Sequence, residues 1–89
     1  MTFDELTTEA RERFAAWQEH NRGASGDDAC DAANAATMTL DIHAATLPVL
    51  MQHPAVVEIL PEAWNPMEPA YVVGRRAVEM AIAERLIAR

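Results

Sequence analysis

The sequence is poor in the residues that carry most enzyme chemistry. It contains no lysine, which excludes Schiff-base catalysis and a lysine clamp on phosphate. Its single cysteine, Cys30, excludes an internal disulfide, and we interpret it as a small buried helix residue. The glycines stand apart at Gly23, Gly26 and Gly74, so there is no glycine-rich phosphate loop.

Metal-binding and catalytic motifs are also missing. His20, His43, His53 and Cys30 do not follow the spacing of metal ligands. Ser25 lacks the flanking residues of a nucleophile elbow and is explained as a helix cap. We therefore predict that the protein is not an enzyme and has no cofactor, metal site or catalytic residue.

No run of about 18 apolar residues occurs, which predicts that the chain does not span a membrane. The first residues are too acidic and polar for a signal peptide, so we expect a cytoplasmic protein.

Charge is distributed unevenly along the chain, whose formal net charge is −7. Residues 1–28 carry three arginines against seven acids, and residues 29–69 carry five acids and no basic residue other than histidine. The sign reverses in residues 70–89, with four arginines and two glutamates. Direct nucleic-acid binding is disfavoured, because it depends on neutralising phosphates. The acidic surface suits a basic protein partner instead.

Apolar periodicity predicts an all-α fold with three main helices in a single domain, residues 1–89. In the first helix, Thr2 and Glu5 form a capping box. One apolar face of that helix then carries Phe3, Leu6, Ala10, Phe14 and Trp17.

We expect the central helix of the bundle to start at Ser25 and to run to Leu47. Its predicted stripe consists of Ala29, Ala33, Ala36, Leu40, Ala44 and Leu47. An alternative is α+β, because Thr37–Ile42 alternates polar and apolar residues as a short strand does.

Five prolines break the segment before the last helix into short pieces. We expect helical turns at Pro48–Gln52 and Pro54–Leu60, and irregular structure over Pro61–Glu68. Trp64 and Met67 are interpreted as apolar plugs that hold this loop to the core. The alternative for Trp64 is an exposed anchor, since tryptophan is enriched in binding hot spots.

The last helix, Glu68–Arg89, has apolar residues on two sides. The first stripe consists of Val73, Ala77, Met80 and Ile87. The second consists of Tyr71, Val78, Ile82 and Leu86, with Arg75 and Arg89 beside it. A helix that is apolar on two sides is buried from two directions. Either the proline-rich segment covers the second stripe, or a partner does.

These features lead to two hypotheses for function. The first is a protein-binding module, an inhibitor or adaptor that occupies the surface of a larger protein, such as one with a basic groove for nucleic acid. Its predicted contacts are Trp64, Tyr71, Arg75, Val78, Ile82, Leu86 and Arg89. In general type, such a small acidic chain without motifs resembles phage and mobile-element inhibitors, including anti-CRISPR proteins. The second hypothesis is a structural protein that forms a helical homodimer through the same stripe.

Overall fold

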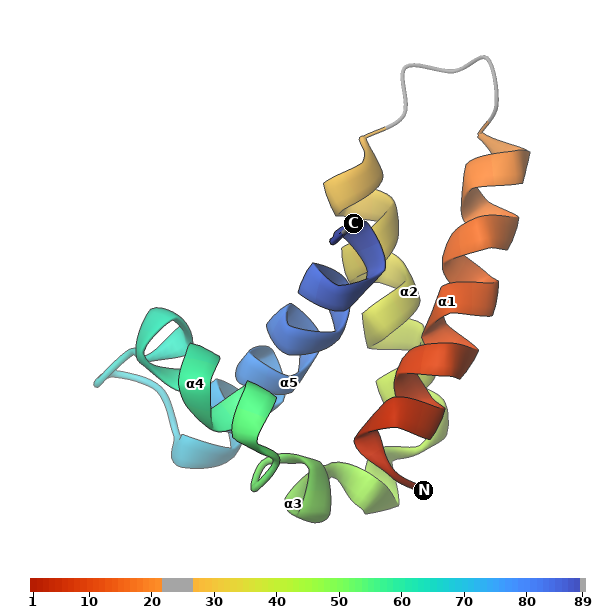
Figure 1. Ribbon diagram of the computed structural model, residues 1–89. Helices are drawn as coiled ribbons and strands as arrows, with labels where there is room; N and C mark the ends of the chain where they lie inside the picture. The colour runs from red at the N-terminus through yellow and green to blue at the C-terminus, as the bar shows by residue number, and fades with distance from the viewer. Residues whose placement is uncertain (22–26, 89) are drawn as a thin grey trace.

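The computed structural model describes residues 1–21 and 27–88, and this part of the chain is all α-helical, without a strand (Figure 1). The elements in order are α1 (Phe3–His20), α2 (Asp28–Ile42), a 3-10 turn (Ala44–Thr46), α3 (Leu47–Leu50), α4 (Pro54–Ala63) and α5 (Ala70–Ile87). The predicted fold class is confirmed, with α1, α2 and α5 as the main helices. No helix in the described ranges is long and apolar enough to cross a bilayer.

Helix α1 forms as its sequence predicts. The Thr2 hydroxyl accepts from the Glu5 N–H, and the Glu5 carboxylate accepts from the Thr2 N–H, each at 3.1 Å. This capping box lowers the pKa of Glu5. The predicted apolar face is buried apart from Trp17, which is half-buried.

Helix α2 begins at Asp28, and Asp27 caps it by accepting from the Ala29 N–H at 2.9 Å. The predicted start, Ser25, lies outside the described residues. The helix runs unbroken through residues 37–42, so the strand alternative was wrong.

The buried face of α2 differs from the predicted stripe. Ala29, Ala33 and Cys30 are exposed, and the buried side chains are Asp31, Ala32, Ala35, Ala36, Thr39 and Leu40. The error has a simple cause. Alanines in this part of the helix spread over a broad arc: at about 100° per residue, Ala29 and Ala33 lie to one side of Ala36 and Ala32 and Ala35 to the other, so the apolar pattern there does not fix the centre of the buried face.

Helix α5, not α2, is the central helix of the bundle. It packs against α2 and α1 on one side and against α4 and α3 on the other (Figure 1). Its buried residues are Val73, Gly74, Ala77, Val78, Ala81, Ile82 and Leu86. They join the apolar faces of the other helices in one core.

The proline-rich segment contains more helix than predicted. Pro48 and Pro54 lie in the first turns of α3 and α4, as expected. Helix α4, however, continues past Pro61 to Ala63, where irregular structure was predicted. A proline in the last turn removes only one backbone hydrogen bond, and Ala63 is anchored by its own burial in the core.

Phe3 joins three segments that are far apart in sequence. Its ring stacks on the His53 ring with centroids 4.4 Å apart, and the Arg85 guanidinium carbon lies 4.6 Å from its centroid. Arg85 also donates to the Asp4 carboxylate at 2.6 Å. These contacts hold the start of α1 against the N-cap of α4 and the last turn of α5.

Candidate functional site

Three of the predicted partner contacts lie in the core. Val78 and Ile82 are completely buried and Leu86 is 5% exposed. Of the two alternatives for this stripe, cover within the chain is the one observed at these three positions, because the bundle packs against α5 from both sides; their assignment as partner contacts was wrong. The two aromatic residues of the predicted set are on the surface instead, with Tyr71 70% and Trp64 61% exposed.

Arg75 is occupied by contacts within the chain. Its guanidinium donates to Asp41 at the end of α2 and to Glu79 on the next turn of α5, the latter at 2.9 Å. These hydrogen bonds raise the pKa of Arg75 above its ordinary value. Arg75 thus tethers α5 to α2 rather than offering a free charge. Arg89, the remaining predicted contact, lies outside the described residues.

Arg76 fixes the segment between α4 and α5. It donates to the Glu68 carboxylate at 2.7 Å and to the Ala63 carbonyl at 3.0 Å. The hydrogen bond from Arg76 is the main cause of the lowered pKa of Glu68. Asn65 also donates to Glu68 at 2.8 Å, so the short loop is held by polar contacts.

Exposed apolar side chains concentrate around this loop and α4. Of the ten large apolar residues that are exposed in the described part of the chain, six lie between residues 49 and 71. They are Val49, Val57, Leu60, Trp64, Met67 and Tyr71. The prediction that Trp64 and Met67 plug the loop onto the core was wrong, since Met67 is 89% exposed. Tethering by Arg76 replaces the apolar plugs that we expected.

Three of these side chains share the outer face of α4. Val57, Leu60 and Trp64 follow at spacings of three and four, which places them on one side of the helix. Val56, Ile59 and Ala63 form the buried side. In Figure 1, α4 lies at one edge of the molecule, and α5 is the helix that packs against it. Sequence reasoning identified Trp64 as a candidate but missed its two neighbours.

An acidic groove of about 280 Å³ runs between α4 and α5. Its walls are Ala55, Glu58, Ile59, Glu62, Ala81, Glu84, Arg85 and Ala88. Within the described residues, Glu58, Glu62 and Glu84 make no ion pair. Arg85 offers them no neutralising contact, because its guanidinium is directed toward Phe3 and Asp4.

A second, open recess of about 390 Å³ lies between α1 and α2. Arg13, Ala16, Trp17, His20 and Met38 line it. It is mostly apolar, and its one guanidinium is engaged by Glu9 and Thr39.

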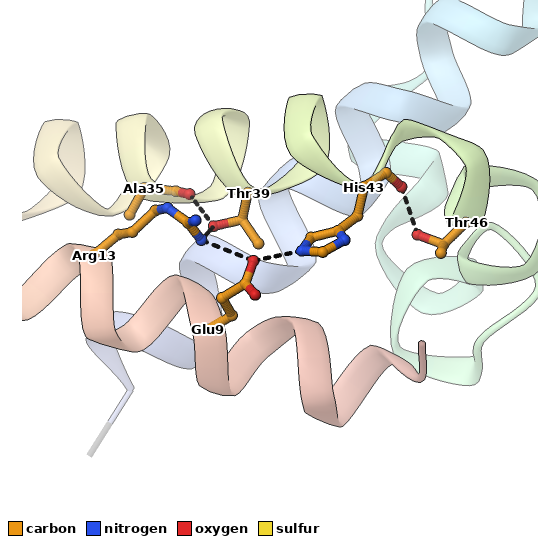
Figure 2. A network of polar contacts seen from close by, with 6 residues as sticks. All are labelled: Glu9, Arg13, Ala35, Thr39, His43 and Thr46. Carbon is orange, nitrogen blue, oxygen red and sulfur yellow. Dashed lines mark hydrogen bonds and ion pairs between the residues drawn. The ribbon is translucent and has the colours of Figure 1, made fainter.

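A network of polar contacts holds α1 against α2, as Figure 2 shows. Glu9 accepts from Arg13 at 2.9 Å and contacts His43 Nε2 at 2.6 Å. Because a carboxylate can only accept a hydrogen bond, this histidine nitrogen carries the proton. The hydrogen bond from Arg13 is the largest cause of the lowered pKa of Glu9, and His43 adds to it. Arg13 also donates to the buried Thr39 hydroxyl at 3.0 Å, which donates to the Ala35 carbonyl at 2.8 Å.

Every member of this cluster has a partner inside the chain, and no recess opens onto Glu9 among the pockets described above. We therefore assign the cluster a structural role. Its residues are separated by up to 34 positions in the sequence, and no motif links them.

Within residues 1–21 and 27–88, no three histidine, cysteine, aspartate or glutamate side chains lie close enough together to hold a metal ion. Comparison of the chain with protein-family models, with curated proteins and with solved structures gave no match.

Proposed function

We propose that the protein is a non-enzymatic binding module that occupies the surface of a larger protein. The observation that carries the proposal is the cluster of exposed apolar side chains between Val49 and Tyr71. Single exposed apolar residues are ordinary on a small protein, whereas a group of them on adjoining segments is typical of interaction sites. Exposed tryptophan and tyrosine are also the residues most often found at the centre of such sites.

The charge supports a more specific form of this proposal. A net charge of −7 and the absence of lysine favour association with a positively charged surface. We propose that this surface belongs to a protein that handles nucleic acid, and that the module inhibits it by blocking its basic groove. This is the mode of action expected of an anti-defence protein of the anti-CRISPR type.

Site-specific photocrosslinking tests the general proposal. A photoreactive residue replaces Trp64 in one version of the chain and Ile42, which is also exposed, in a control version. In cells that carry the gene, we expect the position 64 version to form an adduct with a larger protein and the position 42 version not to. Equal adducts from both positions, or none from position 64, would overturn the proposal.

The inhibitor proposal needs a second measurement on the captured protein. Its binding to a labelled oligonucleotide should weaken as the module is added, and the loss should require Trp64. If the captured protein binds no nucleic acid, or binds it equally well with the module attached, the inhibitory role is refuted while the binding role stands. Light scattering separates the homodimer alternative, because only self-association gives a mass that rises with the concentration of the pure chain.

A further inference from the structure

We infer that His53 is a pH-sensitive switch: protonation of its ring removes the cap of α4 and loosens the first turn of that helix from the start of α1. The switch goes beyond the proposed binding function and does not depend on it. Its basis is the position of the His53 ring, which caps α4 with one nitrogen and stacks on Phe3 of α1.

The start of α4 depends on His53 for its hydrogen bonds. The helix begins at Pro54, which has no N–H group. Val56 and Val57 donate to the His53 carbonyl at 2.9 and 3.0 Å, and Ala55 donates to His53 Nδ1 at 3.1 Å. One residue thus accepts from every N–H group of the first turn.

The cap on Ala55 requires an unprotonated Nδ1. A ring nitrogen accepts a hydrogen bond only while it carries no proton, so the proton of the neutral His53 ring is on Nε2. Protonation of Nδ1 turns the acceptor into a donor that faces the Ala55 N–H, and the hydrogen bond is lost. It also places a positive charge at the N-terminus of α4, where the helix dipole favours negative charge.

The residues of α1 and α5 beside the ring do not stabilise its charged form. Asp4 on α1 already accepts from Arg85 of α5 at 2.6 Å. The Phe3 ring lies 4.4 Å from the His53 ring, between centroids, and the Arg85 guanidinium carbon lies 4.6 Å from the Phe3 centroid. A second cation on Phe3 would therefore be repelled by the first, which offsets its attraction to the ring face.

The other neighbouring elements supply no counter-ion. Glu58 of α4 and Glu84 of α5 line the groove between these two helices, and α3 contains no charged residue. In the part of the chain that the structure describes, His53 forms no ion pair. Because folding uses the neutral ring, the stabilisation by this cap should be complete above the range in which histidine titrates and should be lost as the pH falls through it.

Loss of the cap acts on a helix with few other ties to α1. Helix α4 packs mainly on α5, and the stack of His53 on Phe3 connects its start to α1. Acid should therefore loosen the first turn of α4, which includes the exposed Val57.

The test compares the parent chain with His53→Asn, because asparagine caps a helix through its side-chain oxygen and does not titrate here. The matched control is His20→Asn, which removes an exposed histidine at the end of α1. Urea denaturation at about pH 7.5 and about pH 5 gives the equilibrium constant for unfolding of each protein. The ratio of the parent's constant to that of His53→Asn should rise about fivefold or more on acidification. The ratio of the parent's constant to that of His20→Asn should not rise. A pH-independent loss from the missing stack on Phe3 cancels in this comparison.

NMR on the parent chain measures the cap directly. At about pH 7.5 the ring nitrogen shifts of His53 should show a proton on Nε2 and none on Nδ1. At about pH 5 the protection of the Val57 and Glu58 amides from hydrogen exchange, corrected for the intrinsic rate, should fall about fivefold. Amides in the middle of α1 should keep their protection.

Either of two results would overturn the switch: a proton on His53 Nδ1 at neutral pH, or a ratio of parent to His53→Asn that does not rise in acid. If His53→Asn does not fold, the nitrogen shifts and the amide exchange of the parent chain decide. None of these measurements bears on the crosslink from position 64, so the proposed binding function stands or fails separately.

Discussion

Gly74 offers the sharpest test of the packing in this bundle. It lies buried inside α5, where a glycine costs about 1 kcal/mol of helix stability relative to alanine. An alanine here should therefore stabilise the protein if the site had room. The site has little room, because the side chain of Met51 lies against the glycine. A Cβ atom at position 74 would stand 2.9 Å from Met51 Sδ and 3.3 Å from Cγ, and closer still to Cε.

The net effect follows from two opposing terms. The nearest atoms belong to the end of a flexible methionine side chain that can move aside, so the cost lies near the lower end of the about 1–3 kcal/mol typical of overpacking. The improved helix propensity offsets about 1 kcal/mol, and Gly74→Ala should thus leave the free energy of unfolding nearly unchanged. In a Met51→Ala background the clash disappears and only the propensity remains. The same substitution should then raise the free energy of unfolding by about 1 kcal/mol, a coupling of about 1 kcal/mol between the two positions.

Urea denaturation of the four proteins in this cycle, followed by far-ultraviolet circular dichroism, measures the coupling. The slopes should agree among the four proteins, so that differences in midpoint report differences in stability. If Gly74→Ala stabilises the parent chain and the Met51→Ala variant equally, Met51 does not occupy the space above Gly74. The assigned packing of α3 on α5 would then be wrong.

Three further predictions concern stability. Ile82→Ala should lower the free energy of unfolding by about 3 kcal/mol, since the side chain is fully buried. Trp64→Ala should change it by no more than about 0.5 kcal/mol. Similar losses for the two variants in thermal unfolding would contradict the assignment of core and surface. Thr39→Val should lower the free energy of unfolding, measured in urea, by about 1 kcal/mol, because the hydroxyl that accepts from Arg13 is lost. An unchanged urea midpoint would show that this hydrogen bond does not contribute to stability. The folded-state pKa values of Glu9 and Glu68 are lowered, so their stabilisation is complete above the ordinary value of 4.5 and is lost as the pH falls through the lower folded values. Glu9→Gln should accordingly flatten the acid limb of a plot of urea midpoint against pH, and an unaltered limb would refute the link.

The main helices and their buried faces could be predicted where apolar and charged residues occupy clearly different sides of a helix. Residues 3–20 alternate large apolar and charged residues at helical spacing behind a capping box, so both the start and the buried face of α1 were predicted correctly. In α2 the helix was predicted but its buried face was not, because its alanines span too broad an arc to fix the orientation of the helix. Only contacts with α1 and α5, such as that of Thr39 with Arg13, fix the orientation.

The candidate site could be predicted only in part, because exposure depends on what lies next to a residue. The two apolar sides of α5 were visible in the sequence, but the pattern does not say whether α4 or a partner covers the second one. Trp64 posed the converse problem. Its indole would fill a core, yet the hydrogen bonds of Arg76 already fix the loop, and the indole projects outward. The ion pairs that decide these placements join residues that no local pattern relates.

The position of α4 allows the proposed binding to be tested separately from folding. A substitution on α5 disturbs side chains that α1, α2 and α4 share, so a loss of binding there could not be told from a loss of structure. The outer face of α4 contributes little to the core, because Val56, Ile59 and Ala63 on its other side provide the contacts with α5. The fold itself does not require the exposed apolar surface of Val57, Leu60 and Trp64, and such surface is unfavourable in water. A partner that buries this face would account for that cost, and the variants that test it leave the bundle intact.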